Sequence, residues 1–155
     1  MTSPITTLRD EQQLITSLVD LMKQEQQFLV SADSEGLDTI TPQKSALVQQ
    51  AAILAGQRHR ALGSAGFPAE EAGMEPFLAS SSDDSARALW LALLERTREA
   101  KELNRVNGML INKQMTNTQV ALNAMRTPAG SADTGVYGPG GQTGSGGPSR
   151  RFVVG

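Results

Sequence analysis

Residues 82–126 decide the fold, because SDDSARALWLALLERTREAKELNRVNGMLINKQMTNTQVALNAMR contains no proline and a single glycine, Gly108. The acidic and hydroxyl residues at its start are typical of a helix N-terminus, where they cap free N–H groups and oppose the helix dipole. The next proline is Pro128. The stretch therefore predicts one uninterrupted helix over 82–126, about 67 Å long at a rise of 1.5 Å per residue.

Two shorter amphipathic segments precede this helix. Over residues 5–32, apolar side chains recur every seven positions, and a group of turn residues at 31–34 ends the pattern. A second stripe continues to residue 62, but Pro42 lies inside it and would damage a helix interior. We therefore predict a short helical turn at 34–38, a cap at Thr41 and the second helix over 42–62. Residues 64–81 then read as a connector with one short helical turn at 69–72.

The three segments predict an all-α fold. Short or moderate connections favour an antiparallel, up-down-up, coiled-coil-like bundle of three helices within residues 1–127. Nine of the 15 glycines lie between Gly130 and Gly155, so residues 128–155 are expected to form a flexible, glycine-rich tail.

The third helix is longer than the first, which gives it a surplus of apolar surface. Both helices begin at the same end of the predicted bundle, so the longer one outruns its neighbours near Gly108. An apolar surface without an internal partner normally marks an interaction site. Methionine-rich helix surfaces adapt to varied partners, but the same surface could also dimerise, and the residues alone favour neither alternative. The apolar positions beyond Gly108 are Leu110, Ile111, Met115, Val120, Leu122 and Met125.

Charged residues also fall inside the apolar stripes. In an antiparallel hairpin that turns near Asp33, Glu25 comes level with Lys44, and Glu11 comes level with Arg58. Such pairs would fix the register of the helices. The alternative, that all four side chains lie at the seam edge and reach water, is favoured slightly for each pair.

Two asparagines interrupt the long helix immediately before its apolar end. Asn104 and Asn107 lie one turn apart, and asparagine is a poor helix former, so their presence requires a reason. They could hydrogen-bond an incoming peptide, whose backbone Gly108 would allow to approach closely. Equally, they could form a polar layer that fixes the register of the bundle.

Composition argues against several classes of function. The net charge of -2 offers no basic field for nucleic acid or an anionic membrane. With no cysteine and one histidine, His59, neither a metal site nor a catalytic triad can be argued, so we expect no enzyme activity and no cofactor. The N-terminus lacks a signal-peptide pattern and no apolar run is long enough to insert into a membrane, so the cytoplasm is the expected location.

The chain resembles the FlgN family of flagellar export chaperones over most of its length, from about Leu8 to Gly141. The asparagine–glycine segment and the later Tyr-Gly element are the most specific parts of the match. The matching elements are Leu21-x3-Glu25-x3-Leu29-x3-Asp33, Lys44-x2-Leu47, Arg58, Leu89-Trp90, Asn104-x2-Asn107-Gly108-x-Leu110-Ile111 and Tyr137-Gly138-x-Gly140-Gly141.

This resemblance implies a binding function. FlgN-like proteins hold the hook–filament junction proteins FlgK and FlgL in the cytoplasm, prevent their premature assembly and deliver them to the type III export gate. The resemblance places client binding in the C-terminal part and contact with the gate protein FlhA at Tyr137 and Gly138. The alternative is a structural or adaptor bundle that forms a homo-oligomer through its third helix. The expected client-binding residues are Asn107, Leu110, Ile111, Met115, Thr118, Leu122 and Met125.

Overall fold

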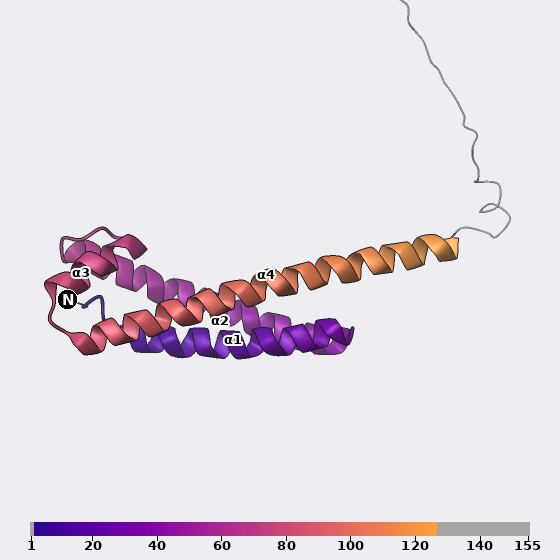
Figure 1. Ribbon diagram of the computed structural model, residues 1–155, viewed down its shortest axis with the longest axis horizontal. Helices are drawn as coiled ribbons and strands as arrows, with labels where there is room; N and C mark the ends of the chain where they lie inside the picture. Colours follow the sequence, from indigo (N-terminus) through magenta and orange to yellow (C-terminus); the bar gives the residue numbers. More distant parts are fainter. Residues whose placement is uncertain (1, 127–155) are drawn as a thin grey trace, which may run out of the picture. The chain divides into compact units, whose positions relative to one another are not determined.

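The computed structural model describes residues 2–126, and every regular element within them is a helix (Figure 1). This confirms the all-α class. The elements are α1 (Leu8–Val30), α2 (Ser34–Ser64), the 3-10 turn η1 (Glu71–Gly73), α3 (Met74–Ser80) and α4 (Asp84–Arg126). The chain divides into a first unit, residues 1–112, and a second unit, residues 113–155. The predicted tail, 128–155, lies outside the described residues.

The second helix differs from its prediction, because α2 runs without a break from Ser34 to Ser64 and contains Pro42 in its interior. The predicted start at residue 42 is therefore wrong. Ile40 is buried and Leu47 is half-buried, so the helix is held against the core on both sides of the proline. Asp38, whose carbonyl loses its usual donor to Pro42, is exposed and can be hydrated instead.

The turn between α1 and α2 is specified locally, as its residues predicted. Asp33 caps α2, since its Oδ1 accepts a hydrogen bond from the Gly36 N–H at 3.0 Å. Ala32 takes a left-handed conformation with φ of 55° to reverse the chain. Gly36 lies directly beneath the ring of Phe28, where a Cβ atom would come within 2.6 Å of ring carbon Cδ1. Only glycine fits there without a shift of the ring.

The predicted connector contains a helix that sequence patterning missed. Whereas a single turn was expected at 69–72, η1 is followed by α3, so the described residues hold four α-helices rather than three. α3 contributes Met74 and Leu78, which are fully buried, and so it closes one end of the first unit. Phe67 and Phe77 pack edge to face beside them, with ring centroids 5.5 Å apart.

The core of the first unit consists of two separate clusters of buried side chains. The cluster at the α3 end contains Leu8, Leu62, Met74, Leu78, Ala86, Trp90 and Leu93. The second cluster contains Leu18, Val19, Met22 and Ala100. Because residues of increasing number on α1 meet residues of increasing number on α4, these two helices run in the same direction within the first unit. Asp83 caps α4 through its Oδ1, which accepts from the Ala86 N–H at 2.9 Å.

Candidate functional site

The end of α4 presents exposed apolar side chains in both units. In the first unit Met109 is 60% exposed and Ile111 is 39% exposed, whereas Leu110 is half-buried. In the second unit the described residues are the helical segment 113–126, and its large apolar side chains are all exposed. These are Met115, Val120, Leu122 and Met125.

Four of the predicted client-binding residues form one face of the helical segment 113–126 of the second unit, which we call the α4 stripe: Met115, Thr118, Leu122 and Met125. Their spacing alternates four and three residues, the pattern by which a helix packs along a partner helix. Thr118 does not interrupt the apolar face, because its Oγ1 donates to the Gln114 carbonyl at 2.9 Å and leaves its methyl group available.

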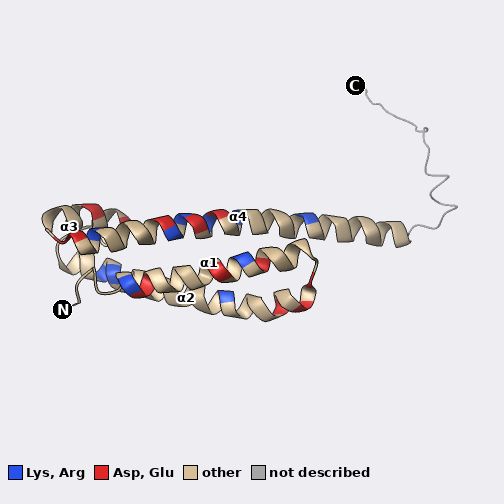
Figure 2. Ribbon diagram, turned by 60° about the horizontal axis from the view of Figure 1, so that its bottom comes forward, with Lys and Arg blue, Asp and Glu red and all other residues tan. Residues whose placement is uncertain are grey.

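Charge is sparse around the stripe. Figure 2 shows that the charged residues of α4 concentrate in its first half; beyond Arg105 only Lys113 and the terminal Arg126 carry a charge. An apolar face of this kind can bind the apolar side of another helix, and its methionines can adjust to different side chains.

Asn107 does not belong to this exposed surface, contrary to its place among the predicted client contacts. It is only 1% exposed, and its Nδ2 donates to the Met22 carbonyl at 2.9 Å and to Glu25 Oε1 at 2.8 Å. These bonds join α4 to α1, as the polar-layer alternative predicted. The Oδ1 atom of Asn107 is buried without a hydrogen-bond partner.

Lys44 extends this polar layer to α2. Its Nζ lies 3.1 Å from Glu25 Oε1, as the hairpin register predicted, and also donates to Asn104 Oδ1 at 3.2 Å. The layer therefore contacts all three long helices of the first unit through side chains. Since Glu25 is 7% exposed and Lys44 is 21% exposed, the lysine reaches inward rather than to water.

The second predicted pair, Glu11 with Arg58, is buried more deeply, so the solvent-exposed alternative was wrong here. Arg58 is 2% exposed, and its Nε and Nη2 donate to the two Glu11 carboxylate oxygens at 2.9 and 3.0 Å. Its Nη2 also donates to Glu71 Oε1 at 2.7 Å, and the guanidinium lies 4.9 Å from the centre of the Trp90 ring.

These contacts perturb the titration of the cluster. Burial alone would lower the pKa of Arg58, but hydrogen bonds and charges from Glu11 and Glu71 raise it above its ordinary value. Burial alone would likewise raise the pKa of Glu71, but the hydrogen bond and charge of Arg58, with a further bond from His59, hold it below its ordinary value. Both groups therefore remain charged near neutral pH, as a structural ion pair requires.

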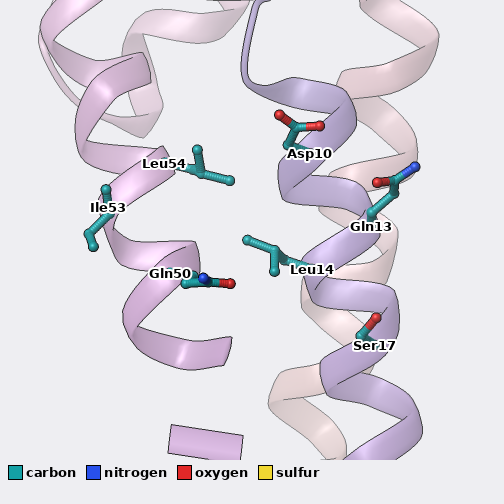
Figure 3. A pocket seen from close by; sticks show the side chains of 7 residues that line it. All are labelled: Asp10, Gln13, Leu14, Ser17, Gln50, Ile53 and Leu54. Atoms are coloured by element: carbon teal, nitrogen blue, oxygen red, sulfur yellow. The ribbon is translucent and has the colours of Figure 1, made fainter. Parts of the chain in front are cut away.

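The hollow between α1 and α2 in Figure 3 shows no assembled catalytic group. It measures about 550 Å³, and Asp10, Gln13 and Ser17 of α1 line it together with Gln50 and Ile53 of α2. Leu14 and Leu54 complete the lining. The seven side chains include no histidine or lysine that could activate the serine hydroxyl.

Two further features of residues 2–126 bear on function. Within that range no three His, Asp or Glu side chains gather closely enough to hold a metal ion. Nor does any helix there have the length and apolar character required to cross a membrane.

These observations define a class: a helical-bundle protein whose described surfaces are suited to binding another protein. The FlgN protein family matches the chain over residues 1–145, and the chain belongs to this family. FlgN proteins are flagellar export chaperones. No curated protein and no solved structure matches the chain.

The structure brings together only part of the predicted site. The α4 stripe is exposed on the second unit, whereas on the first unit Ile111 is exposed, Leu110 is half-buried and Asn107 is buried. Tyr137 and Gly138 lie outside the described residues, so their proposed role as gate contacts stays a prediction. The sequence did not predict the exposure of Met109 or the ion pair of Glu71 with Arg58, because neither residue belongs to a periodic pattern.

Proposed function

We propose that this protein is a cytoplasmic chaperone of flagellar type III export that binds the hook–filament junction proteins FlgK and FlgL. By covering their apolar assembly segments, it prevents premature assembly and delivers them to the gate protein FlhA. In this proposal the α4 stripe holds the client, and Tyr137 with Gly138 contacts the gate.

The exposure of the α4 stripe is the observation that carries the proposal. Apolar side chains at alternating spacings of four and three residues complement an amphipathic helix. Unassembled terminal segments of the clients would gain order on binding, with no bond made or broken. Membership of the FlgN family supplies the biological setting.

The test of this site compares two substitutions on opposite faces of the same helix. Leu122→Asp alters the stripe, whereas Val120→Asp places the same charge two residues away, at about 200° around the helix. Since burying a leucine side chain is worth about 1.5–3 kcal/mol, Leu122→Asp should weaken FlgK binding by about tenfold to hundredfold. Val120→Asp should bind as the unmodified protein does. Equal titration curves for both variants in calorimetry would contradict the proposed site.

A second substitution separates binding from delivery. Tyr137→Ala should bind FlgK with unchanged affinity but reduce the amount of FlgK secreted by cells. Loss of FlgK binding in this variant would show that the two roles are not divided between α4 and the Tyr-Gly element.

The same heptad spacing favours one alternative function, self-association as a structural or adaptor bundle. Light scattering of the purified protein distinguishes the two. A dimer that Leu122→Asp dissociates and that captures neither FlgK nor FlgL would support the adaptor function. A monomer that captures FlgK would support the chaperone.

A further inference from the structure

A cleft of about 610 Å³ lies within the first unit, apart from the α4 stripe. Its α2 wall is formed by Ala51, Ala52 and Ala55, and its α4 wall includes Leu94 and Thr97. Along the chain, this level of α4 falls between the two core clusters, after Leu93 and before Ala100. The alanine side chains are too short to fill the space between the walls, so the apolar core is interrupted here.

The charged groups of the cleft are unevenly satisfied. Both carboxylates are engaged, because Glu11 accepts from Arg58 and Thr7, and Glu71 accepts from Arg58. Arg58, in contrast, has a buried Nη1 atom without a hydrogen-bond partner. Lys101, which also lines the cleft, makes no ion pair with any described residue.

The absence of an ion pair distinguishes Lys101 from its neighbours. Arg96, Arg98 and Arg105 each pair with a glutamate three residues away on α4. The cleft thus offers the unpaired positive charge of Lys101 beside an apolar wall, whereas its carboxylates are occupied. A complementary occupant must supply an apolar body and a carboxylate.

We propose that this cleft is a second docking site, which binds an apolar peptide segment carrying an aspartate or glutamate side chain. The apolar side chains of the segment would fill the gap against Ala52 and Leu94, and its carboxylate would pair with Lys101. From Trp90 to Lys101 the cleft follows α4 for about 16 Å, the length of three helical turns, which suits a peptide. Choosing a FlgK segment as the occupant rests on the proposed function.

Trp90 allows the occupation of the cleft to be observed directly. It is the only tryptophan of the chain, it lines the cleft and it is 3% exposed. The probes are synthetic, dye-labelled, tryptophan-free peptides that together span the two terminal segments of FlgK. One of them should change the emission of Trp90 saturably, with the same midpoint as its own fluorescence anisotropy.

Two substitutions at exposed positions test the cleft without touching its buried ion pair. Ala52→Phe fills the apolar gap and Lys101→Glu reverses the charge, and each should weaken the peptide by about tenfold or more. Ala52→Ser is the matched control and should bind normally. Circular dichroism and thermal unfolding establish that all three variants fold.

The remaining outcomes separate this inference from the proposed function. If a peptide binds, Leu122→Asp abolishes its binding and the cleft variants leave it unchanged, the cleft is not a docking site while the chaperone function stands. If neither a FlgK peptide nor intact FlgK binds the protein, both proposals fail. If Trp90 emission instead changes with protein concentration alone, a second copy occupies the cleft and the peptide proposal is overturned.

Discussion

Replacing Asn107 with leucine should leave the protein folded but loosen the register of α4 against α1. Asn107 is the buried polar side chain that α4 contributes to the first unit, and it bonds the Met22 carbonyl and Glu25. A polar group that is satisfied in only one alignment disfavours every other alignment. An apolar side chain at the same position would pack acceptably in several.

The expected change in stability is small because opposing contributions nearly cancel. The substitution removes one neutral hydrogen bond, worth about 0.5–1.5 kcal/mol, and one to a carboxylate, worth about 1.5–3 kcal/mol. It also removes the buried Oδ1 atom that lacks a partner, which relieves about 1–3 kcal/mol, and it adds buried apolar surface. The free energy of unfolding should therefore change by no more than about 2 kcal/mol.

Thiol cross-linking measures the register, since the chain has no cysteine of its own. Lys23 and Glu99 form an exposed ion pair at 3.4 Å, so cysteines at these positions should cross-link efficiently with a short bifunctional reagent. With Asn107 present this pair should react in high yield, and with leucine the yield should fall because the helix samples other registers. An unchanged yield in the leucine variant would refute the claim that Asn107 sets the register.

Three other expectations follow from the buried contacts. Glu11→Ala should lower the free energy of unfolding by about 3–5 kcal/mol in urea titrations, because it leaves Arg58 buried beside the single, exposed carboxylate of Glu71. Because the pKa of Glu71 is lowered on folding, its stabilising effect is present above the ordinary value of 4.5 and is lost as pH falls through the folded value; Glu71→Gln should flatten the dependence of melting temperature on pH in that range. Gly36→Ala should destabilise the hairpin by about 1–3 kcal/mol through overpacking, whereas Gly108→Ala, with open space around it, should stabilise α4 by about 1 kcal/mol in thermal unfolding.

The features that could be predicted from the sequence depend on short-range physics. The turn near Asp33 and the continuity of α4 follow from residues within a few positions of one another. Hairpin register, which one turn determines, brings Glu25 level with Lys44 and Glu11 level with Arg58, but the slightly favoured expectation that these side chains reach water was wrong. A proline suggests a helix end on local grounds, but burial on both sides of Pro42 overrides that preference.

The features that could not be predicted require contacts between distant segments. The burial of Arg58 depends on Trp90 of α4 and Glu71 of the connector, and no periodic pattern places either beside α2. Similarly, the face of α4 that contains Asn107 packs against α1, while positions a few residues later are exposed. Helical periodicity identifies the faces of α4 but not where its burial ends.

The buried polar layer gives a physical reason for the order of residues along α4. Heptad-spaced apolar residues can pair with any similar stripe, including the α1 and α2 stripes of the same chain. If α4 shifted along α1 and α2 so that they covered its apolar end, the bonds of Asn107 would break and Glu25 and Lys44 would be poorly matched. The polar layer, at a modest cost in stability relative to an apolar core, thus favours the one alignment in which Ile111 remains exposed. Under the proposed function, that selection matters more than stability, because a client surface that the chaperone itself could cover would be lost to the client.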